Sequence, residues 1–124
     1  MARPEAAERD RFLAAVGSLP GVLAHRCEPM TNAYGVRSLP DGFPDVLFAA
    51  CGVVVLVEWK ARRGVLSPAQ LAYHAALASA GVEVLIARSA VECCLDLERL
   101  TGYPLAKVAE SLDAKKLQPV QKDC

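Results

Sequence analysis

The sequence has no excess of positive charge. Its 14 lysines and arginines are matched by 14 aspartates and glutamates. Proteins that bind nucleic acid tightly usually carry a basic surplus, so any binding to phosphate has to come from local patches and a bound metal. Long apolar runs are also lacking, because the longest uncharged apolar stretch, residues 46–57, falls short of the ~20 residues needed to span a bilayer.

Cys-x-x-Cys spacing is absent too. The five cysteines are Cys27, Cys51, Cys93, Cys94 and Cys124. Their odd number and spacing indicate reduced thiols in an intracellular protein rather than a disulfide scaffold or a zinc site. The N-terminal residues are charged where a signal peptide would be apolar, so we expect no targeting signal.

A β-hairpin is the strongest local prediction. Two apolar, β-rich runs, residues 46–48 and 53–57, lie on either side of a break that contains Cys51 and Gly52. If these two residues form the turn, their positions fix the register of the two strands.

In that register Phe48 pairs with Val55, and Asp45 faces Glu58. Directly opposed residues lie about 5 Å apart at Cβ, so the two carboxylates share one position on the sheet. The two negative charges repel each other, so we expect a cation to bind between the two carboxylates. Lys60 points to the same face as Glu58, because side chains alternate along a strand. Two acids and an amine in this arrangement indicate metal-assisted phosphodiester hydrolysis.

The remaining elements predict an α/β fold. We expect helices over residues 4–19, 67–80, 89–101 and 105–112, and further strands over residues 22–27 and 82–87. A strand, a helix and a strand in succession imply a crossover, so the strand at 82–87 should lie parallel to the second strand of the hairpin. Residues 28–44 form a long loop of turn-forming residues, which we expect to touch substrate. The tail from residue 114 onward is expected to be disordered.

Four segments resemble the PD-(D/E)xK nuclease superfamily, and within it the VRR-NUC domain in the small standalone form common in phages and bacteria. They are Gly42–Leu47, Glu58–Lys60, Leu66–Gln70 and Ala80-Gly81. The resemblance covers roughly residues 8–100. Its specificity comes from the Gly-x-Pro before the aspartate, the apolar strand leading to the glutamate, and the Ser-Pro-x-Gln that follows the lysine.

The resemblance implies a restriction-endonuclease-like α-β-β-β-α-β core, with a mixed central sheet flanked by helices. It divides the chain into a nuclease domain, residues 1–104, and a C-terminal helix and tail, residues 105–124. It also implies a Mg²⁺- or Mn²⁺-dependent nuclease acting on DNA, in particular on branched DNA or junctions. Such a protein would be a homodimer in the cytoplasm of a bacterium or a phage-infected cell. Whether it cuts internally or from an end stays open.

Hard-cation chemistry assigns roles to the central motif. Mg²⁺ and Mn²⁺ prefer oxygen ligands and keep several waters, so Asp45, Glu58 and the backbone carbonyl of Trp59 are the predicted ligands. Lys60 would orient or deprotonate the attacking water and stabilise the charge of the transition state. The resemblance adds an acid from the first helix. Glu8 is preferred over Glu5, since it lies one helical turn from an apolar residue and faces the core.

Gln70 has two competing assignments. It occupies the third position of its helix, where a capping box with Ser67 requires Glu or Gln. The resemblance places the same residue in the active site, and we do not expect one side chain to serve both contacts. His74 lies one turn further on the same helical face, and we interpret it as a bystander rather than a ligand.

Three arginines are candidates for DNA binding. Arg37, Arg62 and Arg63 surround the predicted site, so they are expected to contact phosphate, although solvated surface charge is the simpler reading. The alternative function is a non-catalytic nucleic-acid-binding or assembly module on a decayed nuclease fold. The presence of all three central charged motif residues favours the enzyme. A candidate dimer face is formed by Leu105, Val108 and Leu112.

Overall fold

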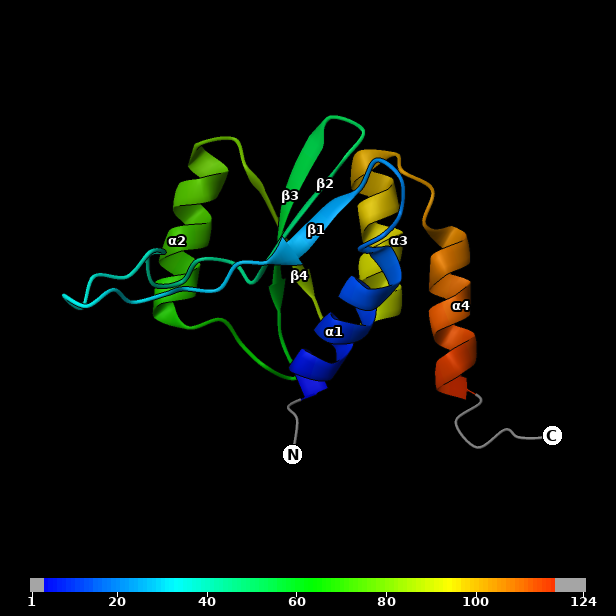
Figure 1. The fold of residues 1–124 in the computed structure, drawn as a ribbon, viewed down its shortest axis with the longest axis horizontal. Helices are drawn as coiled ribbons and strands as arrows, with labels where there is room; N and C mark the ends of the chain where they lie inside the picture. The colour runs from blue at the N-terminus through cyan, green and yellow to red at the C-terminus, as the bar shows by residue number, and fades with distance from the viewer. Residues whose placement is uncertain (1–3, 118–124) are drawn as a thin grey trace.

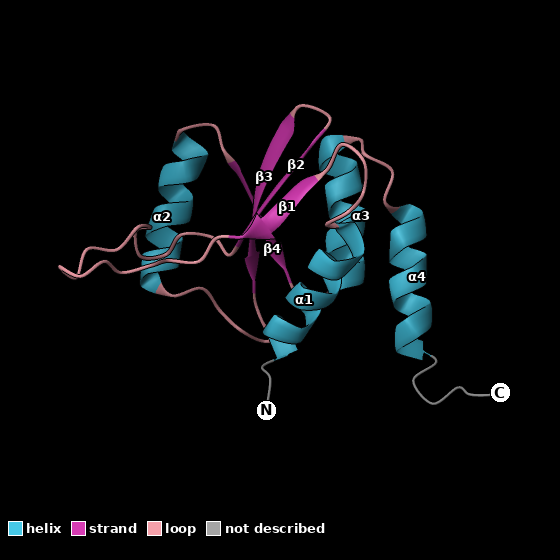
Figure 2. Cartoon of the chain, in the orientation of Figure 1, coloured by secondary structure: helices cyan, strands magenta, loops and turns pink. Residues whose placement is uncertain are grey.

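The computed structural model describes residues 4–117 and has an α/β fold, in which helices flank a mixed four-stranded sheet (Figures 1 and 2). The elements in chain order are α1 (Pro4–Val16), β1 (Leu23–Arg26), β2 (Val46–Ala50), β3 (Val53–Trp59), α2 (Pro68–Ser79), β4 (Glu83–Ala87), α3 (Ala90–Thr101) and α4 (Ala106–Leu117). The predicted fold class is confirmed. Among residues 4–117, none of the helices combines the length and apolar character needed to cross a bilayer.

The sheet has the strand order β1-β2-β3-β4. The first three strands pair antiparallel, whereas β4 pairs parallel with β3. A parallel neighbour requires a crossover connection, and α2 supplies it. The predicted parallel placement of the strand at 82–87 is therefore confirmed.

The hairpin of β2 and β3 has the predicted register. Phe48 pairs with Val55, and the strands meet at a turn formed by Cys51 and Gly52. Both turn residues have positive φ, 54° and 78°. This backbone matches a type I′ turn, whose twist suits the two flanking strands.

The two faces of the sheet are covered differently. On β3, Val55, Val57 and Trp59 point into the apolar core formed with α1, α3 and α4. Glu58 lies between them in sequence and so points to the opposite face. In Figure 1 this opposite face is covered by α2 alone, while the other three helices lie together on the far side of the sheet. The helix α2 contains no buried residue, and on this face of β3 Val54 is 51% exposed whereas Leu56 and Glu58 are buried, so the sheet is open only toward the turn of the hairpin.

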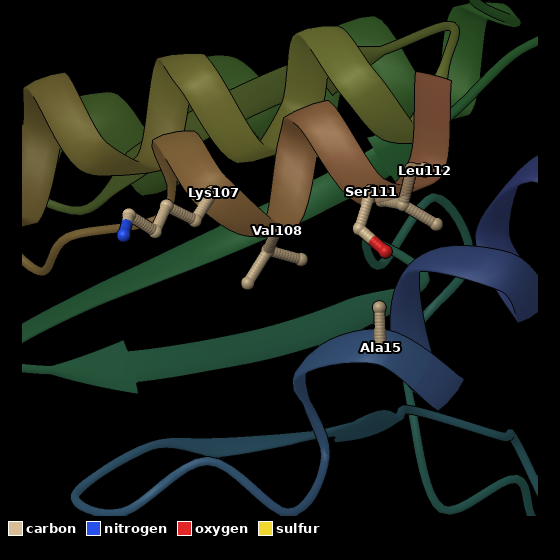
Figure 3. A pocket seen from close by; sticks show the side chains of 5 residues that line it. All are labelled: Ala15, Lys107, Val108, Ser111 and Leu112. Carbon is tan, nitrogen blue, oxygen red and sulfur yellow. The ribbon is translucent and has the colours of Figure 1, made fainter. Parts of the chain in front are cut away.

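The helix α4 belongs to the main core. Leu105 and Leu112 are buried against the same cluster as Phe12, so two residues of the predicted dimer face are used within the chain, and that prediction is wrong in this form. Figure 3 shows the remaining residue, Val108, beside Ala15 of α1 at a hollow of about 330 Å³. The helix also continues through residues 114–117, where we expected a disordered tail; the rest of that tail lies outside the described residues.

Candidate active site

Asp45 and Glu58 meet at the end of the hairpin. The backbone of Asp45 joins both neighbouring strands, because its carbonyl accepts from the Cys27 N–H at 2.7 Å and its own N–H donates to Val57 at 3.0 Å. Its side chain turns toward β3, where Oδ2 accepts from the Trp59 N–H at 2.8 Å. The Asp45 carboxylate raises the pKa of Glu58, both as a hydrogen-bond acceptor for its proton and as a negative charge, so the two carboxyl groups lie close together. The predicted convergence of the two acids is therefore present in the structure.

Glu58 is a buried acid, with 1% of its surface exposed. Burial raises its pKa to about 8, and the hydrogen bond and the negative charge of Asp45 act in the same direction, whereas the positive charge of Lys60 lowers it. Without a cation, Glu58 therefore carries a proton at neutral pH. A divalent ion would replace that proton as the positive partner of the pair.

Gln70 holds Glu58 and caps its own helix at the same time. Its Oε1 accepts from the Ser67 N–H at 2.8 Å, and its Nε2 donates to Glu58 Oε2 at 3.1 Å. Our expectation that one side chain could not serve both contacts was wrong. A side-chain amide carries its acceptor and its donor on different atoms, so the two contacts do not compete.

His74 is a contact that the sequence prediction missed. Its Nε2 lies 3.1 Å from Glu58 Oε1, on the oxygen that Gln70 leaves free. Burial lowers the pKa of His74. The ring is therefore neutral at pH 7, and in its Nε2–H tautomer it donates to Glu58 Oε1. The signal in the sequence was the spacing of four residues from Gln70, which places both side chains on one face of α2.

Lys60 lies at the same site. It directly follows β3, and its N–H donates to the Ala87 carbonyl at 2.9 Å, which extends the contact with β4. Its charge lowers the pKa of both Glu58 and His74, so the amine is within electrostatic reach of both. Within residues 4–117 it forms no ion pair with an acid at 4.0 Å or less. The amine is therefore available to a substrate.

Glu8 has a different role from the one we expected. Its Oε1 accepts from the Ala90 N–H at 2.8 Å at the start of α3, and its Oε2 pairs with Arg11 at 2.9 Å. The acid of α1 whose charge raises the pKa of Glu58 is Glu5. Of the two acids, Glu5 is therefore the one within electrostatic reach of Glu58, while Glu8 is engaged at the start of α3.

The basic turn after Lys60 is held by an arginine from another element. Nη1 of Arg88, at the end of β4, donates to the carbonyls of Ala61, Arg62 and Gly64 at 2.6, 3.3 and 2.8 Å. The side chains of Arg62 and Arg63 are exposed. Two of the predicted phosphate-binding arginines therefore project from a fixed turn beside the candidate site.

The long loop is anchored on α2 and exposed at its tip. Gly42 has φ 85°, and a Cβ at this position would lie 2.3 Å from the Ala69 carbonyl oxygen, so only glycine permits the contact. Phe43 packs next to it on Tyr73, with ring centroids 5.5 Å apart. Figure 1 shows the loop projecting on the side of the sheet that carries α2.

Few side chains hold the tip of this loop. Arg37, the third predicted phosphate contact, pairs with Asp41 at 2.7 Å in its exposed part. The Asn32 side chain accepts from the N–H groups of Tyr34 and Val36 at 2.8 and 3.0 Å. Tyr34 itself is 90% exposed.

The donors at the site match a hard cation better than a transition metal. Within residues 4–117, no three His, Cys, Asp or Glu side chains converge as a ligand set for a metal ion. Mg²⁺ and Mn²⁺ do not require such a set, because they often bind one or two carboxylates and keep several waters. The carboxyl group of Glu58 is protonated because it is buried and a second carboxylate lies beside it. A divalent cation could replace this proton between the two groups. The contribution of the Trp59 carbonyl stays a prediction.

Comparison of the chain with models of known protein families and with curated proteins gave no match. The resemblance to VRR-NUC domains therefore rests on the motif residues alone. Gln70 is hydrogen-bonded to Glu58, and Asp45 and Lys60 both lie close enough to Glu58 to shift its pKa.

Proposed function

We propose that this protein is a nuclease of the VRR-NUC type within the PD-(D/E)xK superfamily, which hydrolyses DNA phosphodiester bonds with Mg²⁺ or Mn²⁺. The observation that supports this best is the pair formed by Asp45 and the buried Glu58, with the amine of Lys60 in electrostatic reach. Burying a carboxyl group beside a second carboxylate is costly unless a proton or a cation lies between them. Because this arrangement lowers the stability of the fold, a functional role explains it better than a structural one.

The roles of the residues follow from their atoms. Asp45 and Glu58, with the Trp59 carbonyl, would hold the cation, which supplies a water of lowered pKa and neutralises charge on the phosphoryl group. The amine of Lys60 would orient the attacking water and stabilise the negative charge that develops on the phosphate oxygens. Gln70 keeps the Glu58 carboxyl in place through its bond to Oε2.

The DNA would reach the site along its open side. The turn with Arg62 and Arg63 offers two positive charges to phosphates on one flank, and the exposed Tyr34 offers a ring for base stacking on the other. We favour branched DNA as the substrate. A homodimer would supply two active sites for cutting both strands of a junction, and we place the protein in the cytoplasm of a bacterium or a phage-infected cell.

Cleavage of a DNA panel tests the proposal. Labelled duplex, single-stranded, flap and four-way-junction DNAs would be incubated with the purified protein and Mg²⁺ or Mn²⁺, or with EDTA. Lys60→Ala should lower the cleavage rate about 10²-fold or more, as the loss of a group that stabilises transition-state charge usually does. Lys107→Ala is the matched control, because Lys107 is an exposed lysine on α4. Metal-dependent cleavage at equal rates by both variants would remove Lys60 from the mechanism.

A second candidate is a nucleic-acid-binding module without catalysis. One observation favours it: both oxygens of Glu58 already accept hydrogen bonds, and its proton is shared with Asp45, so the pair is satisfied without a metal. This reading predicts DNA binding that divalent metals do not change and no cleavage of any DNA in the panel.

A further inference from the structure

Both oxygens of Glu58 are held by side chains of α2, with His74 in its Nε2–H tautomer. Gln70 Nε2 donates to Oε2 at 3.1 Å, and His74 Nε2 lies at 3.1 Å from Oε1. The two donors are one helical turn apart, so a single helix face fixes both ends of one carboxyl group. This arrangement sets the rotation of the carboxyl plane as well as its position.

The contact is specific to the side chain of His74 rather than a by-product of packing. No residue of α2 is buried, so the helix is not fixed on the sheet by a buried apolar stripe. The His74 side chain nevertheless has only 11% of its surface exposed, and Glu58 only 2%. The imidazole is therefore enclosed where it meets the buried acid, one helical turn beyond Gln70.

The remaining lone pairs of Glu58 define a direction. Each carboxylate oxygen offers two acceptor sites, and α2 occupies one on each oxygen. The other two are left for the side of the site that holds Asp45. We propose that His74 is a positioning residue, which acts together with Gln70 to fix Glu58 so that its free lone pairs face Asp45 and a divalent cation bound between them. This inference rests on the proposed function, because it assigns His74 a part in binding the catalytic metal.

Direct ligation by His74 is the weaker reading. The Nε2 atom is already used by Glu58, and Mg²⁺ and Mn²⁺ prefer oxygen donors. A residue that orients a metal-binding carboxylate typically raises the affinity for the metal by about 10- to 100-fold without touching the metal itself. The chemistry at this position matches such a partner.

Two substitutions separate a positioning role from a structural one. The Nε2 of glutamine lies as many bonds from Cα as the Nε2 of histidine, so His74→Gln keeps a donor near Glu58 Oε1. Asparagine reaches only as far as the Nδ1 position, so His74→Asn removes the donor while staying polar. His25→Asn, at an exposed histidine on β1, is the matched control.

The experiment measures Mn²⁺ affinity at one pH near 7.5, by calorimetry and by the electron paramagnetic resonance signal of free Mn²⁺. His74→Asn should raise the Kd for Mn²⁺ roughly 10- to 100-fold, and His74→Gln should restore most of it. His25→Asn should bind as the wild type does. Gln70→Met, which removes the donor to Oε2, should weaken binding in the same way and serves if His74→Asn does not fold. In cleavage assays, the activity lost in His74→Asn should return at high Mn²⁺.

The possible results divide clearly. The positioning role is overturned if His74→Asn binds Mn²⁺ as the wild type does, or if His74→Asn and His74→Gln lose the same affinity. The proposed nuclease stands in either case, provided that Asp45→Asn abolishes Mn²⁺ binding. If the wild type binds no Mn²⁺, or if Asp45→Asn binds it as well as the wild type, the proposed metal site is wrong, and the role of His74 fails with it.

Discussion

Glu58→Gln is expected to remove a steep pH dependence from the stability of the metal-free protein. The pKa of Glu58 is about 8 in the folded chain against 4.5 as its ordinary value. Between these two values the folded state holds a proton that the unfolded chain has lost. The stabilising effect is therefore complete below the unfolded pKa and is lost as the pH rises through the folded pKa.

The magnitude follows from linkage. One bound proton corresponds to a slope of about 1.4 kcal/mol per pH unit, so the free energy of unfolding should fall by roughly 2 to 3 kcal/mol between pH 6 and pH 8. Glutamine does not titrate, and this contribution to the slope disappears. The slope is the informative quantity, because a glutamine has one oxygen for the two donors of α2, and leaving a buried donor unpaired costs about 1 to 3 kcal/mol at every pH.

The measurement is urea unfolding followed by far-UV circular dichroism, in EDTA, at half-unit steps from pH 5.5 to pH 8.5. Wild type and Glu58→Gln share their other titrating groups, so the difference between their slopes isolates Glu58. Burial also raises the pKa of the Cys93 and Cys94 thiols, so these add to the slope near pH 8.5, but they do so in both proteins and cancel in the difference. Parallel slopes for the two proteins would refute the assignment of the proton to Glu58.

Three further predictions concern the site and its surroundings. At pH 8.5 in EDTA, Asp45→Asn should melt at or above the wild-type temperature, because it removes a like charge while its side-chain oxygen still accepts from the Trp59 N–H. On adding Mn²⁺ at a hundred times its Kd, the free energy of unfolding should rise by about 2.7 kcal/mol in the wild type and little in the mutant, so the wild type becomes the more stable of the two. An equal rise in the mutant would contradict a metal site shared by Asp45 and Glu58. Arg62→Ala combined with Arg63→Ala should weaken DNA binding regardless of sequence and lower the salt slope by about 1 to 2, and an unchanged slope would place phosphate elsewhere. Gly42→Ala should destabilise the fold by about 1 to 3 kcal/mol more than Gly21→Ala, since both have positive φ but only Gly42 meets the backbone of α2.

The hairpin was predictable because its register is a local property. The turn residues Cys51 and Gly52 and the alternation of the two short strands are enough to determine which residues face each other. Asp45 and Glu58 are therefore found together from the sequence. The cap formed by Ser67 was predictable for the same reason, since donor and acceptor are three residues apart.

The contacts that the sequence did not predict join distant segments. Helical periodicity led us to prefer Glu8 because it lies one turn from an apolar residue, but which acid lies nearer to Glu58 depends on how α1 crosses the sheet. The hydrogen bond from His74 depends on the depth at which α2 lies over β3. No spacing along the chain specifies either quantity, because both arise from packing between elements.

The arginine that holds the basic turn has a consequence for the proposed association with DNA. Arg88 joins its guanidinium to three backbone carbonyls of the segment after Lys60, so the shape of that segment does not depend on a ligand. A segment already ordered in the free protein loses little conformational entropy when a phosphate arrives. Encounter with DNA should then be fast and set mainly by electrostatic attraction, with no slow ordering step after contact. Arg88→Met, which removes the donor, should leave the turn to order only when a phosphate binds, and should therefore slow association.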